Sequence, residues 1–267
     1  MNEIKFTNTQ LPDIIELRTV SQTYDDGKTW IIKDLNLLIE DKPDQGQFVV
    51  ILGMSGCGKS TLLRYIAGLQ TPSSGHVLIH ERLRSEEAIS MVFQQYSSLP
   101  WRTVLRNITL PLELKGIDPE DAEKRAMDMI RTVGLSGHEK KFAQYPILSG
   151  GQLQRVAIAR SLISNPEIIL MDEPFGALDT NTRFKMQLML AELWDNLKCT
   201  VIFVTHDIQE AVFLGDDIYI MSTNPAKIVD HIGIDLPFHR DRDTKRSKRF
   251  TELVQKVEDA LLATSVE

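Results

Sequence analysis

Residues 53–61, with the sequence GMSGCGKST, have the spacing of a loop that binds phosphate groups. The stretch fits the pattern G-x-x-x-x-G-K-[ST], in which glycines allow backbone N–H groups to approach phosphate oxygens. In this pattern Lys59 reaches the β- and γ-phosphates, Ser60 binds Mg²⁺ and Thr61 adds a contact. A glycine-rich turn without a ligand is the alternative, but the strand and helix expected on either side favour a nucleotide site. The expected phosphate loop consists of Gly53, Met54, Ser55, Gly56, Cys57, Gly58, Lys59, Ser60 and Thr61.

Two neighbouring carboxylates follow an apolar stretch in EIILMDEP, residues 167–174. A strand here delivers Asp172 and Glu173 to the carboxyl edge of a parallel sheet, where open α/β folds bind ligands. Asp172 is expected in the Mg²⁺ shell, and Glu173 is placed to orient or deprotonate an attacking water as a general base. Taken alone, the pair reads as a solvated helix cap; a phosphate loop in the same chain favours the catalytic interpretation.

A second glycine-rich stretch, LSGGQLQR at residues 148–155, precedes a helical pattern. Ser149, Gly150 and Gly151 at a helix entrance combine free backbone N–H groups with the positive end of the helix dipole. The stretch therefore predicts another anion site, although an ordinary serine cap followed by flexible glycines has the same sequence. Two anion-binding stretches in one chain raise the question of whether both bind the same nucleotide.

Hydrophobic periodicity indicates which elements position these residues. We expect amphipathic strands over 13–20 and 30–39, a buried strand over 47–53 that feeds the phosphate loop, and a helix over 61–69. Apolar strands that alternate with helices predict a mostly parallel sheet covered on both faces. The further strands are expected over 76–80, 88–94, 167–172, 200–206 and 217–222.

The remaining segments divide the chain into regions. Residues 103–145 have helical character, with one helix opening at Asp118-Pro119 and ending near Gly134. We expect an N-terminal extension over 1–12, a domain over 13–240 that carries a helical lobe over about 100–150, and a tail over 241–267. The charged stretch 238–250, including its basic run at 245–249, predicts a solvated linker rather than a nucleic-acid or lipid site, and 252–262 predicts a surface helix.

Composition excludes several classes of protein. A net charge of −7 over 267 residues argues against coating duplex nucleic acid, since such binding depends on neutralising phosphates with Lys and Arg. The two cysteines have no metal-ligand spacing, which favours a reducing compartment. No apolar run reaches the roughly 18 residues of a membrane span, and the first residues lack a secretion pattern. We therefore expect a cytoplasmic protein that reaches a membrane only through a partner.

The phosphate loop, the LSGGQ stretch, the Asp-Glu strand end and VTHD at 204–207 together resemble the ATP-binding-cassette (ABC) ATPases over about residues 13–235. The resemblance implies an α/β P-loop NTPase fold of ABC type, with an N-terminal antiparallel β portion beside the mostly parallel core. It also implies two copies packed head to tail, with the LSGGQ of one closing on ATP held by the phosphate loop of the other. The stretch made of Ser149, Gly150, Gly151 and Gln152 then serves the partner's nucleotide.

The same resemblance assigns further residues by motif. Tyr24, in VSQTYDDG, stands where an aromatic ring stacks on adenine; an ordinary strand-end tyrosine is the alternative. Gln94, in MVFQQ, matches a glutamine that touches Mg²⁺ and water and senses the membrane partner. Because Gln95 is also a glutamine, the motif does not distinguish which of the two has this role. Asp179, in GALD, matches the residue that connects the two sites, and His206 matches a histidine that contacts the γ-phosphate. Catalysis is thus assigned to Lys59, Gln94, Glu173 and His206, and metal binding to Ser60, Gln94 and Asp172.

Two segments, 97–108 (SSLPWRTVLRNI) and 221–228 (MSTNPAKI), resemble the ATPases of nitrate, sulfonate and taurine importers. This implies an ATPase that powers import of a small anionic or polar solute through closing and opening of the dimer. The implied partners are an integral membrane permease and a separate solute-binding protein, with no nucleic acid, and the chain lies on the inner face of the cell membrane. The alternative is a soluble ABC ATPase of DNA repair or translation, whose usual coiled coils, zinc sites or fused cassettes are not visible in the sequence.

Two side chains carry expectations of their own. Trp101, which follows Leu99 and Pro100, either rims the groove where a membrane subunit docks or belongs to the core. Cys57 lies within the phosphate loop, so alkylation of its thiol is expected to inhibit the protein and ATP to protect it.

Overall fold

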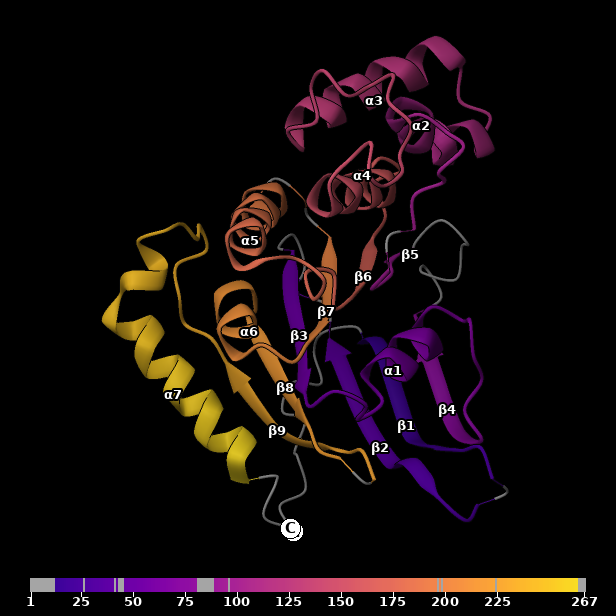
Figure 1. Cartoon of the computed structure of the whole chain (residues 1–267). Helices are drawn as coiled ribbons and strands as arrows, with labels where there is room; N and C mark the ends of the chain where they lie inside the picture. The colour runs from indigo at the N-terminus through magenta and orange to yellow at the C-terminus, as the bar shows by residue number, and fades with distance from the viewer. Residues whose placement is uncertain are drawn as a thin grey trace.

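The computed structural model describes residues 13–25, 27–40, 42, 46–80, 89–95, 97–195, 197, 199–223 and 225–263 (Figure 1). The expected N-terminal extension over 1–12 lies outside these residues. Within the described ranges, no helix has the length and apolar composition needed to cross a bilayer.

The described part of the chain contains two β-sheets (Figure 1). The smaller is antiparallel, in the order β2-β1-β4, and consists of β1 (Asp13–Thr23), β2 (Trp30–Glu40) and β4 (Ser74–Ile79). The larger has the order β5-β6-β7-β3-β8-β9, and only its edge strand β9 runs antiparallel to its neighbour. Its strands are β3 (Gln47–Gly53), β5 (Ile89–Val92), β6 (Ile168–Asp172), β7 (Thr200–Thr205), β8 (Asp217–Met221) and β9 (Ile228–Gly233). This arrangement confirms the expected mostly parallel core with an antiparallel N-terminal portion.

Both faces of the larger sheet are covered because its central strands are apolar on both sides. In β3, Phe48 and Val50 belong to the core built with the later helices, whereas Val49 and Ile51 belong to a second core shared with α1 and the antiparallel sheet. Helix α1 (Lys59–Ile66) buries Leu62 in that second core and so lies between the two sheets. The other helices packed on the sheet are α4 (Gly150–Leu162), α5 (Thr180–Asp195) and α6 (Ile208–Leu214).

The helical lobe consists of α2 (Val104–Leu114) and α3 (Pro119–Thr132), with α2 also packed on α4 (Figure 1). Asp118 caps α3 by accepting hydrogen bonds from the backbone N–H groups of Glu120 and Asp121, as its position before Pro119 predicts. Residues 133–149 form turns and bends that lead to the LSGGQ stretch.

The segment 238–250 is packed against the domain, so the prediction of a solvated linker is wrong. Arg240 is only 4% exposed, and its guanidinium donates to the Asp216 carboxylate at 2.6 Å and to the Phe213 carbonyl at 3.2 Å. Helix α7 (Lys248–Ala263), which confirms the predicted helix, begins within that charged stretch and lies beside α6 (Figure 1). Its apolar face buries Phe250, Leu253 and Val257. A charged composition concealed this packing because a single cation can be buried when a carboxylate receives it.

Candidate active site

The phosphate loop connects the buried strand β3 to helix α1. Gly58 has a φ of +102°, a left-handed conformation that residues with a β-carbon rarely adopt, and it turns the chain into the helix. The helix therefore begins at Lys59, two residues before the predicted start. Because Gly58 supplies no capping side chain, the first N–H groups of α1 stay available for an anion.

Lys59 is 3% exposed and points into the loop. Its ammonium donates to the carbonyl oxygens of Gly53 and Met54, both at 2.9 Å, and lies 3.3 Å from a carboxylate oxygen of Glu173. A buried charge needs such partners, and here the loop's own carbonyls and one carboxylate supply them.

Ser60 and Asp172 bring the loop and strand β6 together. The Ser60 hydroxyl donates to Asp172 at 2.8 Å; burial raises the pKa of Asp172, and this hydrogen bond opposes the shift. Hydroxyl and carboxylate oxygens are ligands that Mg²⁺ prefers, usually together with phosphate oxygens and water. No group of three or more His, Cys, Asp or Glu residues in the described ranges could hold a metal by itself. The donor set therefore fits Mg²⁺ bound jointly with a nucleotide.

Glu173 bridges the phosphate loop and the end of strand β7. Its second carboxylate oxygen lies 3.0 Å from Nδ1 of His206, and its side chain is 13% exposed. The backbone of Glu173 has a φ of +41°, an uncommon conformation for a residue other than glycine and one that recurs at functional sites. Glu173 and His206, predicted independently from two motifs, thus meet at one strand edge next to Lys59.

Gln94 and Gln95 are exposed in the segment that follows β5. The parallel register that pairs Val92 with Met171 places both glutamines at the sheet edge where Asp172 emerges. This position is compatible with either glutamine as the sensing residue, so the role of Gln94 stays a prediction.

Tyr24 is 65% exposed at the end of β1, and its hydroxyl accepts a hydrogen bond from Gln70 at 3.0 Å. A solvent-facing ring held at its hydroxyl suits stacking on a base, as the sequence predicts.

The LSGGQ stretch forms the start of α4. The Ser149 hydroxyl accepts from the Gln152 N–H at 3.3 Å, and the Gln152 side chain accepts from the Ser149 N–H at 2.9 Å, which together make a capping box. A β-carbon on Gly151 would lie 2.6 Å from Cγ2 of Thr182, so close packing of α4 on α5 also requires glycine here. From the sequence alone, this glycine is explained by anion binding or by flexibility after a serine cap, and neither explanation includes its packing against α5.

Asp179 lies just before α5 and is exposed. Its carboxylate accepts from the backbone N–H groups of Asn181 and Thr182, both at 3.1 Å, and hydrogen bonds from Thr182 and Asn181 lower the pKa of Asp179. Within one copy, the residue therefore caps a helix beside the LSGGQ stretch. Its role between two copies stays a prediction.

The thiol of Cys57 faces the core rather than the phosphates. It is 3% exposed among residues of α1 and the antiparallel sheet, and burial raises its pKa although Lys59 opposes the shift. The thiol is therefore turned away from the surface that a nucleotide would contact, and the expectation that its alkylation inhibits the protein with protection by ATP stays a prediction.

A buried carboxylate behind His206 was missed. Glu210 is 4% exposed and accepts from the Thr205 hydroxyl at 2.5 Å and from the Gln187 amide at 2.9 Å. Asp207 caps α6, with Glu210 three residues further on. This D-x-x-E spacing resembles a capping box and was the available sequence signal.

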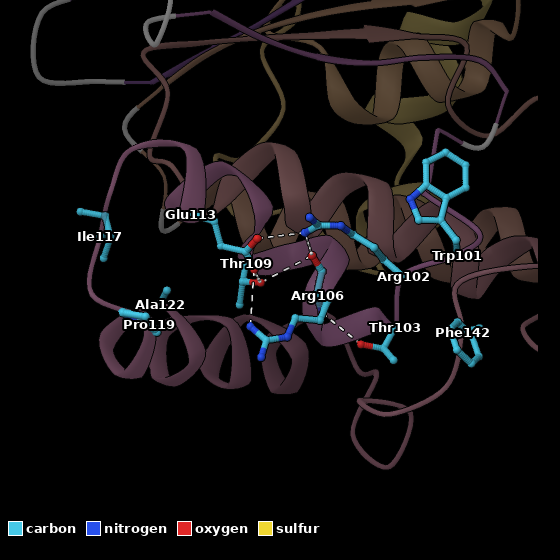
Figure 2. A pocket seen from close by; sticks show the side chains of 10 residues that line it. All are labelled: Trp101, Arg102, Thr103, Arg106, Thr109, Glu113, Ile117, Pro119, Ala122 and Phe142. Atoms are coloured by element: carbon cyan, nitrogen blue, oxygen red, sulfur yellow. Dashed lines mark hydrogen bonds and ion pairs between the residues drawn. The ribbon is translucent and has the colours of Figure 1, made fainter.

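A hollow of about 540 Å³ lies on the helical lobe. Trp101 is 70% exposed and contributes to its lining, so it does not belong to the core. Its position at the groove of a membrane subunit stays a prediction. Figure 2 shows Trp101 and Phe142 at one end of the hollow. The ion pair between Arg102 and Glu113 (2.9 Å) lies nearer its middle. The lining residues are Trp101, Arg102, Thr103, Arg106, Thr109, Glu113, Ile117, Pro119, Ala122 and Phe142.

A phosphate loop between strand β3 and helix α1 faces carboxylates at the end of β6, two strands away in the same sheet. This is the arrangement of P-loop nucleoside triphosphatases. Within that class the chain belongs to the ABC transporter family, whose family model matches residues 33–176. It is accordingly an ATP-binding subunit that hydrolyses ATP, as the motifs predict.

Relatives of the chain include importer ATPases. It is 41% identical over 226 residues to a nitrate import ATP-binding protein of Synechocystis, which covers 84% of this chain and 82% of that protein. It is 44% identical over 234 residues to an aliphatic sulfonates import ATP-binding protein of Bacillus licheniformis, covering 86% of each. Among solved structures, a dimeric ATP-binding cassette in a post-hydrolysis state with ADP and phosphate is 34% identical and has a TM-score of 0.69, covering 83% of this chain and 99% of that one. These likenesses confirm the fold class and the family resemblance.

Proposed function

We propose that this chain drives import of a small anionic solute of the nitrate or sulfonate kind, as two copies packed head to tail beneath a membrane permease. The observation that carries the proposal is an incomplete site. Lys59, Ser60, Asp172, Glu173 and His206 converge on one phosphate loop. Among the described residues, the side-chain hydrogen bonds of the LSGGQ stretch stay within it or reach His138, and none reaches that loop. A second copy would supply the missing side.

ATP binding would exchange the partners of Lys59. Its ammonium would leave the Gly53 and Met54 carbonyls and the Glu173 carboxylate for the β- and γ-phosphate oxygens. Glu173, released from that ion pair, would accept a proton from the attacking water. His206, already 3.0 Å from Glu173, would orient the carboxylate and contact the γ-phosphate.

Ser60, Asp172 and Gln94 would hold Mg²⁺, which supplies charge neutralisation at the phosphates when bound. The 2.8 Å bond between Ser60 and Asp172 supports the first two assignments. Tyr24 would stack on the adenine, and Asp179 would link the two sites of the dimer.

The hollow on the helical lobe would receive the permease. Trp101 and Phe142 offer exposed apolar surface, and the Arg102–Glu113 pair offers charge of both signs. A short amphipathic segment of a membrane protein suits such a surface. The chain would then lie on the cytoplasmic face of the membrane and work with a separate solute-binding protein.

The test is growth of a deletion strain on nitrate as the nitrogen source, or on an alkanesulfonate as the sulfur source. The wild-type gene should restore growth on one of these solutes, whereas Glu173→Gln and Trp101→Ala should not. Glu123→Gln, an exposed change on α3, is the control and should restore growth. Normal growth of the deletion strain on both solutes contradicts the proposed substrate class.

A further inference from the structure

Behind His206, a chain of buried and half-buried polar groups runs to the C-terminal segment. Lys245 lies in the 3-10 turn η2 (Thr244–Arg246), which precedes α7. Its ammonium donates to the Gln187 side-chain oxygen at 2.6 Å, and the Gln187 amide donates to Glu210 at 2.9 Å. Gln187 is 3% exposed and cannot exchange these bonds for water without local opening.

Glu210 is hydrogen-bonded to the end of strand β7, next to His206. Its other carboxylate oxygen accepts from the Thr205 hydroxyl at 2.5 Å, and the same hydroxyl oxygen accepts from the Asp207 N–H at 3.0 Å. His206 stands between these two residues, so the chain fixes the backbone on both of its sides. The imidazole in turn lies 3.0 Å from Glu173.

Two aromatic rings hold Lys245 in addition to its hydrogen bond to Gln187. Its ammonium lies 5.0 Å from the ring centre of Phe184 on α5 and 4.5 Å from that of Phe213 on α6. Aromatic faces and an amide oxygen stabilise a cation without neutralising it. The charge therefore remains to act on the carboxylates behind the strand end.

The charges around Glu210 favour this arrangement. Asp207 repels its carboxylate, whereas Arg183 and Lys245 attract it; burial raises the pKa of Glu210 and lowers the pKa of Lys245. Hydrogen bonds and nearby cations both favour the ionised form of a buried carboxylate, and Lys245 adds to what Thr205, Gln187 and Arg183 supply. Lys245 comes from a segment distant in sequence, so folding of the C-terminal segment determines whether the carboxylate has this cation.

We propose that Lys245 is a positioning residue for ATP hydrolysis: through Gln187 and Glu210 it fixes the turn that presents His206 to Glu173. The inference rests on the proposed roles of Glu173 and His206. It assigns the C-terminal segment to the catalytic apparatus of this chain.

The experiment measures kcat and KM for MgATP with the purified full-length chain. Lys245→Met keeps the side-chain length between the two rings and removes the charge. We expect kcat to fall about tenfold with KM within twofold of wild type, because misplacement of a catalytic group acts on the chemical step. Lys245→Arg should restore kcat to within about threefold of wild type. Arg246→Met, an exposed neighbour with the same loss of charge, is the control and should change neither constant.

A double-mutant cycle distinguishes a relay from general loss of packing. Gln187→Met removes both central hydrogen bonds and should lower kcat as Lys245→Met does. If Lys245 and Gln187 act through the same hydrogen-bond relay, the kcat of the double variant should lie within about twofold of the kcat of the less active single variant. Multiplicative losses, or an unchanged kcat in folded Lys245→Met, overturn the inference. Thermal melting of every variant shows which are folded.

Glu173→Gln, assayed in parallel, separates failure of the inference from failure of the proposed function. Hydrolysis abolished by Glu173→Gln but untouched by Lys245→Met refutes only the relay. Hydrolysis untouched by Glu173→Gln refutes the assignment on which the relay depends.

Discussion

Glu173→Gln is expected to change ATP binding and ATP hydrolysis in opposite directions. The carboxylate lies 3.3 Å from the buried Lys59 ammonium and 3.0 Å from His206. ATP must displace the carboxylate from Lys59, and a general base must then carry a negative charge. An amide of the same shape competes weakly for Lys59 and cannot accept a proton, so binding should strengthen while hydrolysis is lost.

The geometry sets the size of both effects. Two opposite unit charges about 4 Å apart attract by roughly 4 kcal/mol at an effective dielectric constant near 20, and desolvation cancels much of this. A net competition of about 1 kcal/mol corresponds to roughly fivefold tighter ATP binding in the variant. Removing a general base costs roughly 10²–10⁴ in rate. Glu173→Gln should therefore hydrolyse ATP at about 1% of the wild-type rate or less.

Binding is measured by calorimetry with ATP in the presence of EDTA, which prevents hydrolysis, and turnover by phosphate release with Mg²⁺. Light scattering with MgATP should detect an ATP-bound dimer that accumulates in the variant. Glu123→Gln makes the same charge change on the exposed surface of α3 and should match wild type in all three assays. Unchanged turnover in Glu173→Gln refutes the general-base assignment, and weaker ATP binding refutes the competition with Lys59.

Three further expectations concern buried or paired groups. Arg240→Met should lower the free energy of unfolding by about 1–3 kcal/mol in urea titrations, because it removes the buried cation that pairs with the half-buried Asp216 carboxylate; an unchanged free energy of unfolding counts against this pairing. Iodoacetamide should modify Cys57 slowly in the native chain and rapidly in urea, as followed by mass spectrometry, since the buried thiol has a raised pKa; equal rates contradict the packing. Asp217 is partly buried, yet hydrogen bonds from His231 and Lys42 lower its pKa to about 2. Its contribution of about 1–2 kcal/mol should be present above pH 4 and disappear as the pH falls toward 2, so Asp217→Asn should flatten the pH dependence of unfolding in that range; an unchanged slope contradicts the shift.

Residues with strong local signals could be placed from the sequence. The glycine spacing of 53–61 and the apolar run before Asp172 predict two strands of one parallel sheet, β3 and β6, which lie on either side of β7. Their carboxyl ends share one edge of the sheet, and Ser60 donates to Asp172 there at 2.8 Å. The capping residues Asp118 and Ser149 were likewise predictable, because a cap depends on neighbours within three positions.

Contacts between distant segments could not be predicted in this way. The direction of the Cys57 side chain depends on how α1 packs between two sheets, which local spacing does not contain. The burial of Arg240 depends on Asp216, at the end of another element, and that of Lys245 depends on Gln187 and Phe213. The charged composition of 238–250 therefore predicted a solvated segment, whereas residues distant in the sequence bind Arg240 and Lys245 in the folded chain.

The central claim is that each copy completes the nucleotide site of the other, and heterodimers test it most directly. Co-purified dimers carry Lys59→Ala on one copy and Ser149→Arg on the other, or both changes on one copy beside a wild-type partner. Head-to-tail pairing leaves one intact site in the first dimer and none in the second. The account predicts ATP hydrolysis by the first dimer and almost none by the second. Equal activity of the two dimers, or full activity of a Ser149→Arg homodimer, contradicts it.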